Sequence, residues 1–135
     1  MGMLSNAKFL DIFGPLPYTD SSKGDGRIDI DPKWVADNIV TLHTVLIPNI
    51  RCHVKIAKQL AGALSAVHLR GLGGLIKTFD GMFVPRHIQW NLRKGLSRHS
   101  WGVAIDLNAA TNAQGKYNRE LEPVAAVMSD RKSVV

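Results

Sequence analysis

The sequence predicts a small α+β domain, with a small antiparallel sheet, one main amphipathic helix and short flanking helices. Two observations predict this class. One long segment carries apolar residues at helical spacing, whereas several short segments alternate polar and apolar residues or are rich in β-branched ones. The chain has 135 residues, of which 45% are apolar and 21% charged, and this is enough apolar material for a single core.

The N-terminal part, residues 1–26, is expected to be an arm or loop. Glycine, proline, serine and aspartate are frequent in residues 14–26, and these residue types favour turns over regular elements. Residues 27–135 are then expected to form the folded domain.

The first regular elements are expected directly after this arm. Residues 27–30 alternate polar and apolar side chains, as a short edge strand does. Asp31 supplies an N-cap and Pro32 suits a first helical turn, so a short helical turn should run through Trp34. Residues 38–47 are rich in β-branched side chains, which predicts a second strand.

The main helix is expected to begin at His53. From residue 57 to residue 68, apolar side chains recur every three or four positions, and polar side chains occupy the other faces. The helix should end at a group of three glycines, Gly71, Gly73 and Gly74.

Beyond this helix the chain should alternate short strands and loops. Residues 75–79 predict a strand, followed by a turn at Asp80-Gly81. The polar and irregular residues 86–97 are typical of an active-site loop. Residues 103–107 alternate again, which predicts a strand that carries Asp106, and a further helix is expected to begin within residues 123–128.

The composition argues against several classes of protein. The longest apolar runs are far shorter than the roughly 20 residues of a membrane span, and no basic-then-apolar signal peptide opens the chain. The net charge of +6 suits an anionic partner, but the basic residues are scattered without stacking aromatics, which argues against nucleic acid. Cys52 is the only cysteine, so an intramolecular disulfide is excluded.

Two side chains near the C-terminus are of types that bind zinc, the imidazole of His99 and the carboxylate of Asp106. Between them, Gly102 permits a tight backbone path and Trp101 would form a wall of the site. A cluster of basic residues that begins at Arg86 leads into this run, and positive charge beside a metal suggests an anionic substrate.

The run from Ser97 to Asp106 matches the pattern Ser-x-His-x-x-Gly-x-Ala-x-Asp. On this pattern the chain resembles the zinc D-alanyl-D-alanine carboxypeptidase family, which includes phage L-alanyl-D-glutamate endolysins. Residues 78–86 and 106–108, with Asn112, look like the flanking segments of phage-type members. The resemblance covers roughly residues 38–115.

The resemblance implies a zinc metallopeptidase that hydrolyses amide bonds involving D-amino acids in the stem peptides of peptidoglycan. His99 and Asp106 would be zinc ligands, and Arg86 would bind substrate or stabilise the oxyanion of the tetrahedral intermediate. Ser97 would orient a ligand or the turn through a hydrogen bond. With Trp101 and Gly102, it would border the substrate groove. Such a protein would be made in the cytoplasm and act at the cell wall as a phage lysin or a virion-associated enzyme.

The chain departs from the family pattern after Asp106. Family members carry an acidic general base there, closely followed by a third zinc-ligand histidine, but no histidine follows Asp106 in this chain. The general base is therefore unknown, and we expect a C-terminally truncated member with impaired hydrolysis. His87 is an alternative third ligand, and the alternative function is a non-catalytic derivative of this fold that binds the cell wall or has a structural role. The acidic residues that follow Asp106 are Glu120, Glu122 and Asp130.

Overall fold

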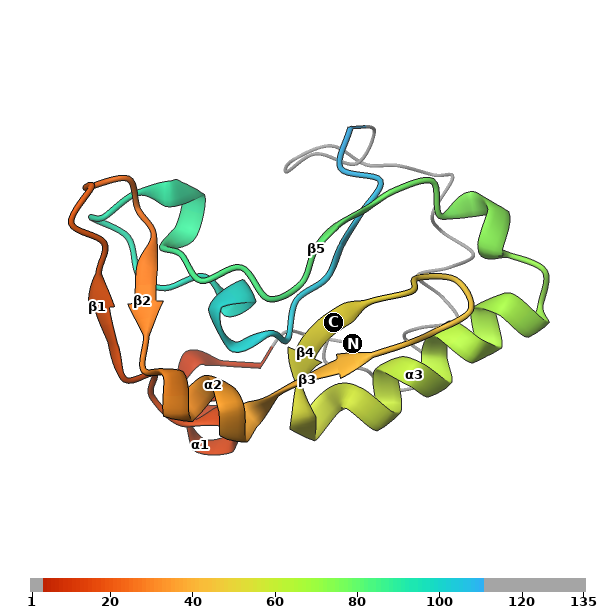
Figure 1. Cartoon of the computed structure of the whole chain (residues 1–135), viewed down its shortest axis with the longest axis horizontal. Coiled ribbons are helices and arrows are strands. Elements are labelled where there is room, and N and C mark those ends of the chain that lie inside the picture. The colour runs from red at the N-terminus through yellow and green to blue at the C-terminus, as the bar shows by residue number, and fades with distance from the viewer. Residues whose placement is uncertain (1–3, 111–135) are drawn as a thin grey trace.

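The structure is a computed structural model that describes residues 4–110 (Figure 1). Its helices and strands are α1 (Asn6–Phe13), β1 (Tyr18–Asp20), β2 (Ile28–Ile30), α2 (Pro32–Asn38), β3 (Ile39–Leu42), β4 (Ile50–His53), α3 (Val54–Leu69), β5 (Phe79–Gly81) and β6 (Asp106–Leu107). Three short 3-10 turns are η1 (Gly73–Leu75), η2 (Ile88–Trp90) and η3 (Arg98–Trp101). The predicted α+β class is confirmed, although the strands form three antiparallel pairs, β1–β2, β3–β4 and β5–β6, instead of one small sheet.

The main helix, α3, contributes the largest share of the core. It begins after His53, whose Nδ1 accepts a hydrogen bond from the backbone N–H of Lys55 at 3.0 Å. Burying a leucine side chain such as those of α3 stabilises the fold by roughly 1.5–3 kcal/mol. Gly71 follows the helix with a left-handed φ of 73°, so the predicted helix and its glycine end are confirmed. The buried residues of α3 are Ile56, Leu60, Ala63, Leu64, Ala66 and Val67.

β3 and β4 form an antiparallel hairpin that packs against α3 (Figure 1). The strand predicted over residues 38–47 is confirmed only from Ile39 to Leu42, because Asn38 still belongs to α2 and the chain leaves the strand after Leu42. The Oγ1 of Thr44 accepts a hydrogen bond from the backbone N–H of Ile47 at 3.0 Å and donates one to its carbonyl at 2.8 Å. These bonds turn the chain, which then returns as β4.

Residues 6–13 form a helix, so the prediction of an arm or loop over residues 1–26 is wrong for this segment. The Oγ of Ser5 caps α1 by accepting a hydrogen bond from the backbone N–H of Lys8 at 3.2 Å. Phe9 and Phe13 lie one helical turn apart and are buried in the same core as α3. The same N-terminal part also supplies β1, which pairs with β2.

β2 lies where the sequence predicts a strand, and α2 begins at Pro32 as expected but extends to Asn38, beyond the short turn predicted through Trp34. Asp31 accepts a hydrogen bond from the backbone N–H of Lys33 at 2.9 Å and so caps α2. Pro32 occupies the first turn, where the lack of an N–H costs nothing. Local capping chemistry is therefore enough to place this element.

β5 and β6 pair antiparallel, with Gly81 opposite Asp106. The strand predicted over residues 75–79 is wrong, because only Phe79 enters β5, and Asp80-Gly81 lies inside the strand instead of forming a turn. The strand predicted over residues 103–107 is confirmed only at its end, where β6 lies.

Asn108 fastens the end of β6 to the segment that precedes β5. Its Oδ1 accepts hydrogen bonds from the backbone N–H groups of Lys77 and Thr78 at 2.7 and 3.0 Å, and its Nδ2 donates to the Leu75 carbonyl at 2.8 Å. The helix predicted at residues 123–128 lies outside the described residues. Within residues 4–110, none of the helices is long and apolar enough to cross a membrane.

Candidate metal site

His99 lies on η3, a short turn that is fixed at both ends. Before it, the Oγ of Ser97 accepts a hydrogen bond from the backbone N–H of His99 at 3.3 Å. After it, Gly102 adopts a left-handed φ of 73°, and its N–H donates to the His99 carbonyl at 3.1 Å. Ser97 and Gly102 therefore set the orientation of the turn that carries the predicted ligand.

Gly102 also lies directly against β4. Its carbonyl accepts a hydrogen bond from the backbone N–H of His53 at 2.9 Å. A Cβ at this position would lie 3.0 Å from the backbone nitrogen of His53 and 3.1 Å from the Cδ1 of Ile39. The backbone angle and this close approach both require glycine here.

The structure brings the two predicted zinc ligands together. The pairing of β6 with β5 carries Asp106 to the turn that holds His99, and the Oδ2 of Asp106 lies 3.2 Å from the Nε2 of His99. His99 is buried, whereas the Asp106 side chain is 53% exposed. The pair is therefore open to solvent on its carboxylate side.

A backbone carbonyl determines which ring nitrogen of His99 faces Asp106. The Nδ1 of His99 lies 3.1 Å from the carbonyl oxygen of Met82. Because a carbonyl can only accept a hydrogen bond, Nδ1 carries a proton, and in the neutral imidazole Nε2 then carries a lone pair. That lone pair faces a carboxylate, which is also an acceptor. A proton or a metal ion between the two atoms would turn this contact into an attraction.

The distances suit a metal ion shared by His99 and Asp106. Two ligands bound to tetrahedral zinc at about 2.0–2.1 Å are about 3.3 Å apart, close to the observed Nε2–Oδ2 distance of 3.2 Å. A hydrogen bond from the other ring nitrogen to a carbonyl is the usual arrangement around a metal-bound histidine. A catalytic zinc takes three protein ligands, and residues 4–110 contain no group of three or more histidine, cysteine, aspartate or glutamate side chains that could hold a metal.

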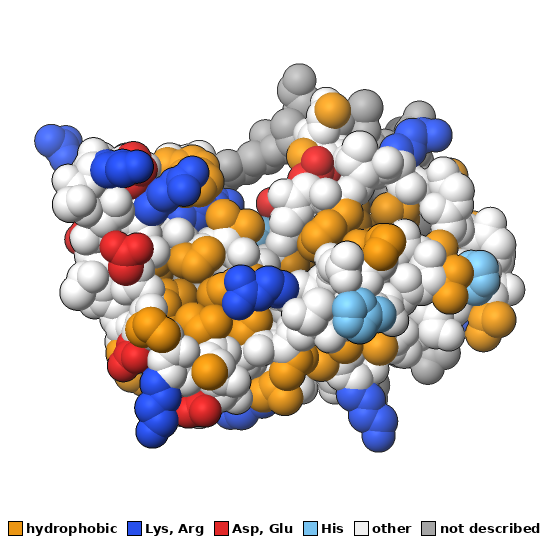
Figure 2. Space-filling view, viewed as in Figure 1, with side chains coloured by type: hydrophobic (Ala, Val, Ile, Leu, Met, Phe, Trp, Pro, Cys, Tyr) orange, Lys and Arg blue, Asp and Glu red, His pale blue; other side chains and the backbone are white. Residues whose placement is uncertain are grey.

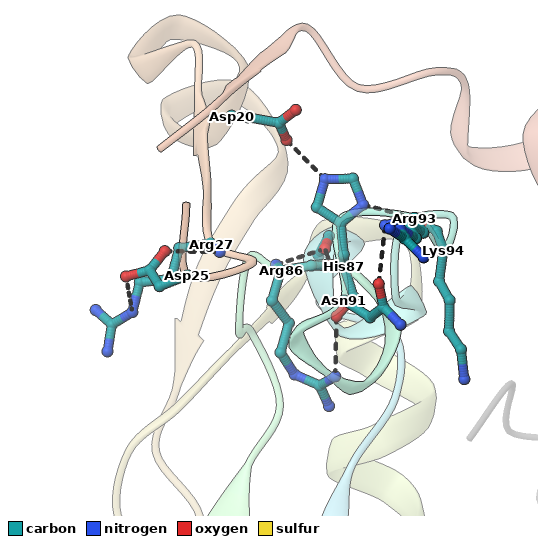
Figure 3. Close-up of polar contacts among 9 residues, drawn as sticks. Asp20, Asp25, Arg27, Arg86, His87, Asn91, Arg93 and Lys94 are labelled. Atoms are coloured by element: carbon teal, nitrogen blue, oxygen red, sulfur yellow. Dashed lines mark hydrogen bonds and ion pairs between the residues drawn. The ribbon is translucent and has the colours of Figure 1, made fainter. Parts of the chain in front are cut away.

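His87, the alternative third ligand, is engaged elsewhere (Figure 3). Its Nε2 lies 2.6 Å from the Oδ1 of Asp20, and its Nδ1 lies 2.7 Å from the Lys94 carbonyl. The hydrogen bond to Asp20, with that to the Lys94 carbonyl, raises the pKa of His87. Both ring nitrogens of His87 already face acceptor oxygens, so His87 is not placed to complete the site.

Cys52 is not arranged as a ligand or nucleophile either. It lies on β4 within the hydrophobic core and is fully buried. Burial raises the pKa of its thiol to about 11, and a thiol that stays protonated is a poor metal ligand. At this position Cys52 acts as a small buried apolar residue.

The backbone of Arg86 is held beside η3. The Oγ of Ser100 accepts a hydrogen bond from the Arg86 N–H at 3.0 Å and donates one to the Arg86 carbonyl at 2.8 Å. The guanidinium lies 5.2 Å from the centroid of Trp90 and donates to the His87 carbonyl at 3.3 Å. In the described part of the chain it makes no hydrogen bond or ion pair with the predicted zinc ligands.

Trp101 supports the site from the side of the core. Its indole Nε1 donates a hydrogen bond to the Gly14 carbonyl at 2.8 Å, and its ring meets that of Phe9 edge-on at 5.0 Å. This position differs from the expected wall of a substrate groove, because the indole is buried against α1. Trp101 instead joins the η3 turn to the N-terminal helix.

Two contributions to the site were not predicted. Met82 acts through its backbone carbonyl, which leaves no signal in the residue type. Ser100 acts through its hydroxyl, which bonds the backbone of Arg86. It stands at a variable position of the signature, so only its residue type indicates that it can form hydrogen bonds. Both residues position other groups of the site.

Comparison of the chain with protein-family models, with curated proteins and with solved structures gave no match. The interpretation of the site therefore rests on its geometry and on the signature between Ser97 and Asp106.

Proposed function

We propose that this chain is a zinc-dependent peptidase of cell-wall stem peptides, of the endolysin or D,D-carboxypeptidase type, with His99 and Asp106 as two zinc ligands. The observation that carries the proposal is the 3.2 Å separation of the Nε2 and Oδ2 atoms, both of which are acceptors when the imidazole is neutral. The signature that contains both residues favours zinc over a proton as the bridging cation. A bound zinc ion would supply the Lewis acidity that hydrolysis of an amide needs.

The residues around this pair would orient the ligand and bind the substrate. The Met82 carbonyl holds the Nδ1–H of His99 and so directs Nε2 toward Asp106. The guanidinium of Arg86 donates to one carbonyl, that of His87, among the described residues. Its other N–H groups would bind a substrate carboxylate or the negative charge that develops on the scissile carbonyl.

A second function, binding to the cell wall without catalysis, is favoured by one observation. Residues 4–110 bring His99 and Asp106 together but contain no group of three or more side chains that could hold a metal ion. Glu120, Glu122 and Asp130 lie outside the described residues, and so does any base that they would provide. In this alternative, a proton instead of a metal would join His99 to Asp106.

Zinc content and amide hydrolysis together separate these functions. The proposal predicts close to one zinc per chain and the release of new amino groups from purified peptidoglycan. His99→Ala and Asp106→Ala should each weaken zinc binding more than about tenfold and abolish the release. His68→Ala removes an exposed histidine at the end of α3 and should change neither measurement. A wild-type protein without zinc and without hydrolysis would contradict the peptidase proposal.

A further inference from the structure

An exposed aromatic side chain on the loop that leads into the metal motif, that of Trp90, lies near Arg86 of the same loop and Arg27 of the β1–β2 hairpin. Trp90 is 46% exposed, and the guanidinium carbons of Arg27 and Arg86 lie 5.7 and 5.2 Å from its ring centroid. Two further apolar side chains of this loop, Ile88 and Leu92, are also exposed. We call Trp90, Arg27, Ile88 and Leu92 the Trp90 patch; Arg86 borders this patch and stays assigned to the proposed metal site.

The backbone under this patch is strained. Gln89 and Trp90 have consecutive left-handed φ angles of 55° and 57°, which non-glycine residues rarely adopt. Gly26 on the neighbouring hairpin makes room for them, because a Cβ on Gly26 would overlap the backbone of Trp90. Such strain persists only where the surrounding structure imposes it, and it is concentrated at functional sites.

The loop that presents Trp90 is closed at its base. The backbone N–H of Ser97 donates to the Arg86 carbonyl at 3.0 Å, and the backbone N–H of His87 donates to the Gly26 carbonyl at 2.8 Å. Ser97 is also the first residue of the metal motif. The loop residues of the patch and the metal motif are therefore carried by one continuous and anchored segment, and Arg27 reaches the patch from the β1–β2 hairpin.

Positive charge exceeds negative charge around the Trp90 patch. The same loop carries two further cations, Arg93 and Lys94 (Figure 3). The acidic neighbours are already paired, Asp20 with His87 at 2.6 Å and Asp25 with Arg27 at 3.7 Å. Figure 2 shows lysine and arginine side chains beside hydrophobic ones at the upper left of this face, over the β1–β2 hairpin. The local surface is therefore complementary to an anion.

We propose that the Trp90 patch binds an anionic wall glycopolymer, in which phosphodiesters link sugars or polyols. Guanidinium groups donate paired hydrogen bonds to phosphate oxygens, and an exposed indole packs well on the C–H groups of a sugar or polyol. A repeating polyanion matches cations spread over two segments better than a single carboxylate does. This inference rests on the proposed function, which places the chain at the cell wall.

Calorimetry tests this proposal by comparing the affinity of the protein for two polymers at the same ionic strength. They are poly(glycerol phosphate) and a single-stranded oligonucleotide with the same number of phosphates. The wild type should bind the polyol polymer at least about tenfold more tightly. Arg27→Gln and Trp90→Ala should each weaken this binding by about fivefold to tenfold. Their controls, Lys58→Gln and Leu69→Ala, make matched changes at exposed positions on α3 and should have little effect. Trp90→Phe retains an aromatic ring if the alanine variant does not fold.

Three results would overturn the glycopolymer proposal. They are an absence of polymer binding, equal or tighter binding of the oligonucleotide, and an equal loss in Lys58→Gln and Arg27→Gln, which would indicate bulk charge only. His99→Ala should bind the polymer as the wild type does. Hydrolysis is measured separately, on peptidoglycan from which the glycopolymer has been removed. If the protein binds the polymer but does not hydrolyse this peptidoglycan, only the peptidase proposal is contradicted.

Discussion

The carboxylate of Asp20 and the imidazole of His87 meet at 2.6 Å although 67 positions separate them in the sequence. The contact joins the β1–β2 hairpin to the loop before η3 (Figure 3). The His87 side chain is only 7% exposed, and its other ring nitrogen faces the Lys94 carbonyl. Since both partners are acceptors, the hairpin is held most firmly when His87 is protonated.

Removing the Asp20 carboxylate should reduce stability more at slightly acidic pH than at alkaline pH. The contact raises the pKa of His87 above its ordinary value of 6.5. Its stabilisation is therefore complete below about pH 6.5 and is lost as the pH rises through the higher pKa of the folded state. Asp20→Asn should lower the free energy of unfolding by about 1 kcal/mol at pH 6 and by less at pH 9, measured by urea denaturation.

Asp29→Asn is the matched control for this change, because Asp29 is an exposed carboxylate on the paired strand β2. It should leave the pH dependence of stability unchanged. NMR titration of His87 gives an independent check, since its pKa should fall in Asp20→Asn. An unchanged His87 titration in that variant would contradict the assigned contact.

Sequence patterns located the elements whose signals are local. The apolar spacing of α3 and the Asp31 cap of α2 each depend on residues within a few positions, and both predictions are confirmed. The approach of His99 to Asp106 was expected from one short signature, and the two side chains do lie together. Local residue chemistry is sufficient in these cases.

The features that escaped prediction depend on distant segments or on competing local signals. No periodicity marks the pairing of β5 with β6 or the contact of His87 with Asp20, because each joins parts of the chain far apart in sequence. α1 has local signals of its own, a serine cap and two phenylalanines one turn apart, but the adjacent turn-rich residues 14–26 give a stronger signal for a loop.

Gly102→Ala should destabilise the protein by about 2 kcal/mol or more and weaken zinc binding. The left-handed φ of 73° is unfavourable for alanine, and the added Cβ would press on the backbone of His53. Gly62→Ala is the control, because Gly62 lies inside α3 and a Cβ added there would meet no atom within 4 Å. This control should be stabilising by about 0.5–1 kcal/mol in thermal denaturation. Equal effects of the two substitutions would rule out a special role for Gly102.

Asn108→Ala should destabilise the protein by about 2–3 kcal/mol, because it removes hydrogen bonds to three backbone groups before β5. Hydrogen exchange gives the specific signature, since the amides of Lys77 and Thr78 should lose protection. Asn91→Ala removes an exposed side chain that bonds only the backbone N–H of Arg93 among the described residues, and it should cost less than about 1 kcal/mol. Retained protection of both amides in Asn108→Ala would count against this role.

His53 is a buried histidine that resists protonation. Its Nδ1 accepts a hydrogen bond from the Lys55 N–H, so its Nε2 carries the proton, and Nε2 has no hydrogen-bond partner in the described part of the chain. The rings of Phe13 and Trp34 lie 5.0 and 5.9 Å from the imidazole. Burial, with a smaller effect of the Lys55 charge, lowers the pKa of His53 to about 4.

His53→Asn should therefore change how stability depends on acid. Because the folded state binds this proton only near pH 4 and the unfolded state binds it near pH 6.5, wild-type stability should fall by up to about 3 kcal/mol between these values. Asparagine keeps an acceptor for the start of α3 but does not titrate, so the variant should be less stable at pH 7 yet lose less on acidification. Urea denaturation at pH 7 and 4.5 measures both effects. His68→Asn, at an exposed position, is the control and should lose as much stability on acidification as the wild type does. If His53→Asn also loses as much stability as the wild type, His53 is not the source of the acid dependence.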